Sequence, residues 1–168
     1  MVGVKTKVVT SIETTGSFAH NGPLLPRLVE ATARNFQLET VMADKAYSIK
    51  RNLQAVSDTG ATPYFPFRKS FTAGKDTPTL WRKLWHYYHY NREDFLTHYH
   101  LRSNAGSTFS MIKAKFGERL RSKTETAQTN EVLLKVLCHN ICCLIRSMYE
   151  VGLEPTFWAK DAPALKAP

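Results

Sequence analysis

The sequence predicts an α/β protein, with a partly parallel sheet flanked by helices and a helical C-terminal part. Two observations carry this prediction. Short apolar runs bounded by polar residues alternate with stretches of helical periodicity between residues 24 and 67. From residue 80 onward, apolar residues recur at spacings of three and four, which is typical of helices. The rhythm of helix, strand, helix and strand favours parallel pairing in the sheet.

Three stretches have the composition of strands. Residues 2–14 are rich in Val, Thr and Ile and alternate in short pieces, which predicts one or two strands. Residues 39–43 form a short apolar run typical of a buried strand. Residues 61–67 contain Pro63 and Pro66, so we expect them at a sheet edge or at a strand end.

Helical periodicity is interrupted by turn residues, which divides it into separate segments. The helices expected from this pattern cover residues 24–35, 48–58, 80–93, 93–100, 107–116 and 131–149. Ser107 is the expected N-cap of the fifth helix, and Thr129 or Asn130 that of the sixth. Gly152 is expected to end the sixth helix. Because that helix carries an apolar side from Val132 to Ile145, we expect it to be mostly core.

The composition of the chain indicates which kind of partner and which cellular setting to expect. The chain has 168 residues, enough for one domain or for part of a larger one, and 43% of them are hydrophobic. Its formal net charge of +9 favours an anionic partner, most commonly nucleic acid. Three cysteines lie close together near the C-terminal end without disulfide-type spacing, which predicts a reducing, cytoplasmic setting. We find no signal peptide and no apolar run as long as a membrane span, so we expect no membrane partner.

The most informative stretch runs from Tyr99 to Lys113. Gly106 and Lys113 are seven residues apart, so they lie on one side of the predicted helix, two turns from each other. Tyr99 and Arg102 come just before and can fold over the same patch. Separately, Asp44 directly follows the predicted buried strand 39–43, which is where α/β folds place their chemistry.

These residues carry a resemblance to a known family. The order Tyr99, Arg102, position 106 and Lys113 resembles the Tyr-Arg-Glu-Lys signature of the IS4-like insertion-sequence transposases of the DDE class. Residues 41–48 (VMADKAYS) are similar to the segment around the family's second catalytic aspartate, which makes Asp44 its counterpart. The resemblance covers roughly residues 2 to 150 and implies an RNase H-like mixed sheet. One position departs from the pattern, because Gly106 stands where the family has a catalytic glutamate.

The resemblance also implies that part of the family's domain is missing. The family's first catalytic aspartate lies on a strand that precedes the region matched here, and no residue of this chain matches it. We therefore expect a C-terminal fragment of the catalytic domain that lacks the first strand. Residues 1–152 would be the partial RNase H-like domain, with an insertion-like basic and aromatic segment at 68–98, and residues 153–168 a loose tail.

The family cuts and rejoins DNA with two Mg²⁺ ions held by three carboxylates. In this chain the resemblance leaves Asp44 as the single family metal ligand, because Gly106 has no side chain. Glu93 and Asp94 lie nearby in sequence but do not fit the family spacing. We therefore expect a truncated copy, inactive in strand cleavage and transfer, because one carboxylate, Asp44, cannot hold two Mg²⁺ ions.

The expected partner is DNA, both transposon ends and target DNA, so that the protein would be associated with the nucleoid when bound. Homodimerisation or association with an intact transposase is also consistent with the family. The resemblance implies phosphate contacts by Tyr99, Arg102 and Lys113, and the basic loops supply further candidates. These are Arg68, Lys69, Lys75, Arg119, Arg121 and Lys123.

Plainer interpretations stay open for each of these groups. Asp44 is also a plausible helix N-cap, and Arg102 and Lys113 are also plausible as solvated charges. Metal binding is a minor alternative for His86 with His89, and for Cys138, His139, Cys142 and Cys143 on the last helix. Trp81 and Trp85 are expected in the core rather than stacked on bases. A non-catalytic basic module that binds nucleic acid or an intact transposase is the alternative function.

Overall fold

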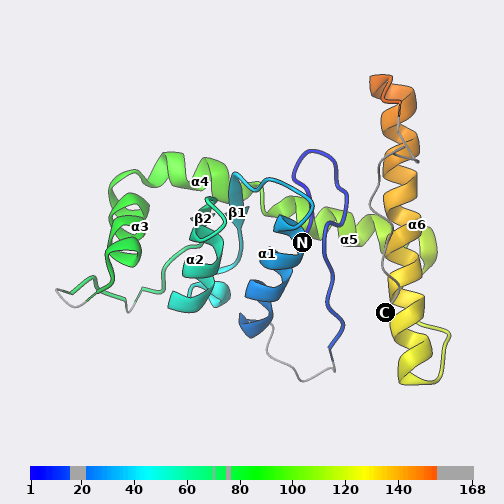
Figure 1. The fold of residues 1–168 in the computed structure, drawn as a ribbon, viewed down its shortest axis with the longest axis horizontal. Helices are drawn as coiled ribbons and strands as arrows, with labels where there is room; N and C mark the ends of the chain where they lie inside the picture. The colour runs from blue at the N-terminus through cyan, green and yellow to red at the C-terminus, as the bar shows by residue number, and fades with distance from the viewer. Residues whose placement is uncertain (16–21, 70, 75–76, 155–168) are drawn as a thin grey trace.

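The computed structural model describes residues 1–15, 22–69, 71–74 and 77–154. Figure 1 shows a mixed α/β arrangement in which a body of short elements lies at one end and a long helix stands at the other. The helices are η1 (Gly22–Leu24), α1 (Leu25–Ala33), η2 (Lys45–Tyr47), α2 (Lys50–Ser57), α3 (Thr79–Tyr90), α4 (Arg92–His100), α5 (Ser103–Phe116) and α6 (Glu125–Val151). The strands are β1 (Thr40–Met42) and β2 (Thr62–Tyr64).

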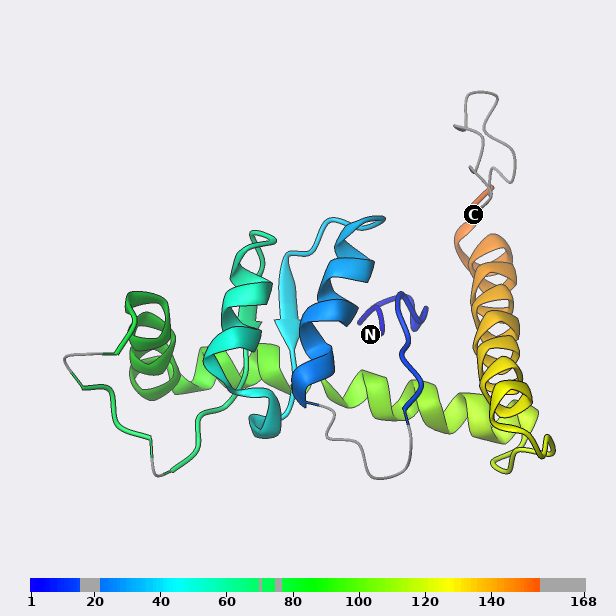
Figure 2. The same ribbon diagram turned by 60° about the horizontal axis from the view of Figure 1, so that its bottom comes forward.

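β1 and β2 form a two-stranded parallel sheet in which Thr40 pairs with Thr62 and Met42 with Tyr64. Both strands lie where the sequence predicts them, and they are parallel because α2 makes the crossover between them. Helix α2 and helix α4 both contact β2. In Figure 2 α1 and α2 stand beside the strands, while α4 and α5 run one after the other beneath them.

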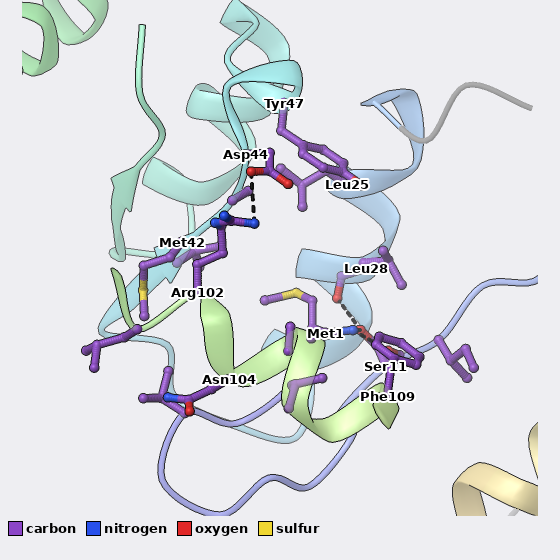
Figure 3. A pocket seen from close by; sticks show the side chains of 18 of the residues that line it. Met1, Ser11, Leu25, Leu28, Met42, Asp44, Tyr47, Arg102, Asn104 and Phe109 are labelled. Carbon is purple, nitrogen blue, oxygen red and sulfur yellow. Dashed lines mark hydrogen bonds and ion pairs between the residues drawn. The ribbon is translucent and has the colours of Figure 1, made fainter. Parts of the chain in front are cut away.

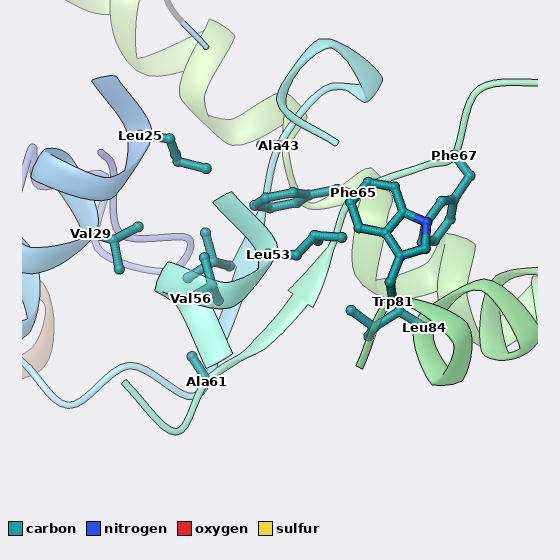
Figure 4. Packing of buried hydrophobic residues seen from close by; sticks show 11 residues of the cluster. Leu25, Val29, Ala43, Leu53, Val56, Ala61, Phe65, Phe67, Trp81 and Leu84 are labelled. Atoms are coloured by element: carbon teal, nitrogen blue, oxygen red, sulfur yellow. The ribbon is translucent and has the colours of Figure 1, made fainter. Parts of the chain in front are cut away.

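The main core lies between these elements. Figure 4 shows Leu53, Phe65 and Trp81 packed together, with contributions from α1, β1, α2 and α3. Phe65 and Leu53 are each only 1% exposed, and Trp81 is 7% exposed. Trp85 packs against the edge of the same cluster. The prediction of a core position is therefore confirmed for Trp81, whereas Trp85 is partly buried at the edge of the core.

Residues 2–14 differ from the prediction of regular strands. They form a hairpin with one isolated antiparallel bridge, Val2 to Val9, and Lys7 in its turn has a positive φ of 60°. A second, smaller core joins this hairpin to α5 and α6 through Val9, Ile112 and Val136. Asn140 of α6 exchanges two hydrogen bonds with the backbone of Val9, at 2.8 and 2.9 Å. In a regular sheet a neighbouring strand would bond the outward backbone groups of Val9. Here the Asn140 side chain bonds them instead.

Two predicted N-caps are wrong. Helix α5 begins at Ser103, so Ser107 lies inside it and donates its hydroxyl to the Asn104 carbonyl at 2.9 Å. Helix α6 begins at Glu125, where the Thr124 side chain accepts a hydrogen bond from the Ala127 N–H. Both helices begin several residues before the apolar periodicity of their sequence does. Polar residues extend each helix toward its N-terminus because their backbone groups are hydrogen-bonded. Gly152, with φ 67°, ends α6 as predicted.

The expectation that α6 is mostly core is also wrong. Only Val136 and His139 are buried on it, while Leu134, Leu137 and Ile141 are each 46–58% exposed. Cys138 is exposed, and Cys142 and Cys143 are half-buried. By length and composition α6 is apolar enough to cross a membrane, contrary to the sequence prediction, although a single helix of this kind is weak evidence.

The proposed division into residues 1–152 and a tail stays a prediction. Residues 155–168 of the tail lie outside the described part of the chain. The insertion-like segment 68–98 contains α3 and most of α4, which extend the body at the end opposite α6 (Figure 1).

Candidate active site

Asp44 lies two residues beyond the end of β1, at the carboxyl end of the strand. The buried residues Val41 and Ala43 fix the strand on the core, which leaves Asp44 at its rim with a side chain that is 52% exposed. Asp44 occupies the N-cap position of η2, yet its side chain makes no capping hydrogen bond. Its carboxylate is therefore turned away from the helix and toward other partners.

Those partners come from the junction of α4 and α5. The Arg102 guanidinium lies 2.9 Å from the Asp44 carboxylate, and the Tyr99 hydroxyl lies 3.5 Å from the same oxygen, Oδ1. The Arg102 guanidinium also sits over the Tyr99 ring, 5.3 Å from its centroid. The structure thus brings Asp44 together with Tyr99 and Arg102, which lie more than fifty residues further along the sequence.

A cavity of about 510 Å³ opens beside this cluster, and Figure 3 shows Asp44 and Arg102 at its margin. Gly106 lines the same cavity from the first turn of α5. A Cβ atom built on Gly106 would meet no other atom within 4 Å. A side chain at position 106 therefore has room to reach toward the cavity that Asp44 borders.

The surroundings of Asp44 also act on Tyr47, which follows it in η2 and lines the cavity. Burial, and secondarily the negative charge of Asp44, raise the pKa of the Tyr47 phenol above its ordinary value. Tyr47 therefore stays neutral at physiological pH and presents a hydroxyl group rather than a phenolate.

The other predicted site residues lie apart from this cluster. Lys113 is exposed near the end of α5 and forms an ion pair with Glu118 at 3.0 Å. Arg68 and Lys69 are exposed after β2, and Lys75 lies outside the described residues. Arg119, Arg121 and Lys123 are exposed on the segment between α5 and α6. The chain thus presents its basic residues as several separate groups.

Sequence reasoning missed how the segment between α5 and α6 is held. The Glu131 carboxylate accepts hydrogen bonds from the backbone N–H groups of Arg121 and Ser122, both at 2.9 Å to Oε2. Lys135 forms an ion pair with Glu131 and donates to the carbonyls of Gly117 and Arg119. The Ser122 N–H above all lowers the pKa of Glu131 to about 2. The spacing of Glu131 and Lys135, four residues on one helix face, was the available signal.

His139 was a weak metal-site candidate, and the structure gives it a packing role. It is fully buried, its Nε2 lies 3.0 Å from the Lys7 carbonyl, and the Cys143 sulfur lies 3.4 Å from the same nitrogen. His86 and His89 are engaged with aromatic rings on α3. Among the residues that the structure describes, no three His, Cys, Asp or Glu side chains are grouped to hold a metal ion.

In a comparison with protein families, the model described as the transposase DDE domain matches residues 1–141. The matched region includes the body, the Asp44 cluster, the cavity and the first two-thirds of α6. No curated protein and no solved structure matches the chain significantly.

Proposed function

We propose that this chain, which belongs to the transposase DDE domain family, takes part in DNA transposition. In this proposal it binds DNA but does not cleave DNA by itself. Membership supports a transposase function with DNA as substrate. The proposal that the chain does not cleave DNA rests on one observation. Asp44 is paired with Arg102, beside a cavity that Gly106 lines without a side chain.

The donor set at this site does not fit a pair of divalent ions. The family is generally dependent on divalent metals, and two ions about 3.5–4 Å apart need several oxygen ligands between them. Here Asp44 supplies one carboxylate, and a guanidinium already neutralises it at 2.9 Å. Glu93 and Asp94 lie in the first turn of α4, where Asp94 contacts Tyr87 and His98 instead. We therefore derive no catalytic step through metal ions for this chain.

Two further features support the narrower family assignment that we propose, to the IS4-like class with an RNase H-like domain. The first is the contact of Tyr99 and Arg102 with Asp44, since the Tyr-Arg-Glu-Lys signature and the second aspartate resemble parts of one site. The second is the parallel pair β1 and β2, with Asp44 following the first strand.

DNA binding rests on the exposed basic residues. Arg102 presents a planar guanidinium suited to phosphate, and Tyr99 supports it from one side. The segment with Arg119, Arg121 and Lys123 is fixed by Glu131 and Lys135, so its charges are held in place before DNA arrives. We propose that these groups and Lys113 contact the phosphate backbone, and that the protein associates with the nucleoid through them.

The deciding experiment tests both halves of the proposal. Purified protein is incubated with transposon-end DNA and Mg²⁺ or Mn²⁺, and cleavage is followed on gels while binding is measured at several salt concentrations. We expect binding that weakens with salt, by about 0.9 in the logarithmic slope per phosphate contacted, and no cleavage. Cleavage that depends on the metal would overturn the inactive assignment.

A set of variants makes the result specific to the site. Gly106→Glu is expected to gain one Mg²⁺ site in isothermal titration, and Gly106→Gln, which lacks the charge, is expected to gain none. Arg102→Ala should weaken DNA binding, whereas Arg34→Ala should not, although Arg34 also forms an exposed ion pair, with Glu30 at 2.8 Å. Equal loss in both arginine variants would show that binding depends on net charge alone.

The alternative is a module that binds an intact transposase rather than DNA. The exposed apolar residues of α6 favour it, because they are unsuited to contact phosphates. Co-purification with an intact transposase in the absence of DNA would support this function, and strong binding to DNA alone would argue against it.

A further inference from the structure

The Asp44 carboxylate occupies a position that suits an oxyanion. The Arg102 guanidinium lies 2.9 Å from the Asp44 oxygen Oδ1, and the Tyr99 hydroxyl approaches the same oxygen at 3.5 Å. Figure 3 shows the Arg102 side chain directed at Asp44. Donors of this kind bind carboxylates and phosphates with similar geometry. The chain therefore fills a potential phosphate site with a carboxylate of its own.

The two donors are held in place by their own helical segment. Arg102 donates its backbone N–H to the Tyr99 carbonyl at 3.0 Å, in the turn between α4 and α5. The Tyr99 ring stacks on Phe95, whose side chain is fully buried, with 6.4 Å between the ring centroids. The Tyr99 ring in turn supports the guanidinium of Arg102. The position of both donors is therefore fixed without a contribution from Asp44.

Asp44 reaches the donors from a different element, directly after β1. Its backbone carbonyl accepts a hydrogen bond from the Tyr47 N–H at 2.9 Å, which fixes its main chain. The Asp44 side chain is 52% exposed and that of Arg102 is 41% exposed. An ion pair between side chains as exposed as these favours the paired state by a factor of about five at most. A second anion can therefore displace Asp44 if it is held near enough to Arg102.

From this geometry we infer that Asp44 is a specificity-determining residue, which keeps isolated phosphate ions away from Arg102 and admits the phosphates of DNA. A free phosphate ion has to displace the carboxylate and then lies beside its negative charge. A DNA phosphate meets the same obstacle, but basic residues elsewhere on the chain hold the DNA close to the protein. This raises the effective concentration of its phosphates at Arg102.

General repulsion between Asp44 and every anion is the plainer interpretation. Repulsion acts on a nearby phosphate whether or not Arg102 is present, whereas displacement of a bound carboxylate acts only through Arg102. The two interpretations therefore differ in how substitutions at the two positions combine. The admission of DNA rests on the proposed DNA-binding function, and the exclusion of free phosphate does not.

The first test titrates inorganic phosphate into the purified full chain at constant ionic strength, with EDTA present so that no divalent ion binds Asp44. Binding is followed by NMR at the Nε–Hε resonance of Arg102. We expect Asp44→Asn to bind phosphate at least about fivefold more tightly than the original protein. Glu13→Gln is the matched control and should bind phosphate as the original protein does. Glu13 is exposed and lines the same cavity, while the ion pair of Arg102 is with Asp44.

The second test measures binding of duplex DNA by fluorescence anisotropy in a double-mutant cycle. Asp44→Asn should tighten DNA binding by at most about fivefold, and this gain should disappear when Arg102→Ala is also present. Inorganic phosphate, again at constant ionic strength, should weaken DNA binding by Asp44→Asn and leave binding by the original protein unchanged. If Asp44→Asn does not fold, as judged by its circular dichroism, Asp44→Ser takes its place in both tests.

Two results would overturn the inference. The first is equal phosphate affinity in the original protein and in Asp44→Asn. The second is an equal gain in DNA affinity from Asp44→Asn with and without Arg102, which would indicate general repulsion. A chain that binds no DNA, but in which Asp44→Asn strengthens phosphate binding, would support the exclusion of free phosphate and overturn the DNA-binding proposal. The two failures are therefore distinguishable.

Discussion

The two ends of the molecule are stabilised in different ways. The body around β1 and β2 buries a continuous apolar cluster, with Phe65, Leu53 and Val56 at most 1% exposed. The other end, where the hairpin meets α5 and α6, buries Val9, Ile112 and Val136 and relies on polar contacts from His139 and Asn140. The comparison indicates that the body can hold its shape by packing, whereas α6 is positioned by a few specific hydrogen bonds.

The largest effect is expected from the core of the body. Phe65→Ala removes a buried aromatic ring and should cost about 3–5 kcal/mol of unfolding free energy, measured by thermal or urea denaturation. Phe36→Ala, at a residue that is 49% exposed, serves as the control and should change stability little. Equal losses from the two substitutions would contradict the assignment of the core.

The next largest effect concerns the attachment of α6. Asn140→Ala leaves the N–H and carbonyl of Val9 without partners and should cost about 1–3 kcal/mol. Amide hydrogen exchange should become faster in the hairpin before it becomes faster in the body. Asn35→Ala, at an exposed residue, is the control. If the hairpin amides exchange as slowly in Asn140→Ala as in the original protein, packing alone holds this end together.

A smaller effect is expected at the start of α6. Thr124→Ala removes the side-chain oxygen that caps the helix and should cost about 1 kcal/mol, seen as fraying of its first turn in NMR chemical shifts. Thr126→Ala, two residues further along and exposed, should leave the turn intact. Fraying in both variants would mean that threonine content rather than the cap stabilises this turn.

The smallest and most local effect depends on pH. The pKa of Glu131 is lowered to about 2 from an ordinary value of 4.5, so its stabilising contribution is complete above about pH 4.5 and is lost as the pH falls toward 2. The amide chemical shifts of Arg121 and Ser122 should titrate with a midpoint near 2. Glu131→Gln should remove this titration, and a midpoint near 4.5 would show that the carboxylate is not bound as described.

The body could be predicted largely from sequence, and the α6 end could not. Residues 39–43 and 48–58 combine apolar periodicity with turn residues on either side, so local pattern locates β1 and α2. Helix α6 has an equally clear apolar stripe, but periodicity reports that a face is apolar without reporting whether anything covers it. The pairing of Asn140 with Val9 depends on residues 131 positions apart, which no local pattern encodes.

The candidate site also has features that the sequence predicts and features that it does not. The place of Asp44 after a predicted strand marks it as a candidate site residue, and the family spacing groups Tyr99 with Arg102. The ion pair between Asp44 and Arg102 is not predicted from the sequence, because the resemblance implies a metal ion as the partner of Asp44 and DNA as the partner of Arg102. The roles of these residues in DNA binding stay predictions. The predicted N-cap at Ser107 is wrong because a serine inside a helix can donate its hydroxyl to a carbonyl of the preceding turn, as Ser107 does to Asn104.

The contact between Val9 and Asn140 also has a consequence for the order of folding. Before α6 is made, the hairpin has its own bridge and the hydrogen bonds of Thr10 and Ser11 with α1, but the backbone of Val9 still has no partner for its outward groups. Closing a loop of 131 residues costs entropy that local contacts do not repay. We therefore expect the body to fold first, and the arm of the hairpin around Val9 to reach its final conformation only when α6 docks against it.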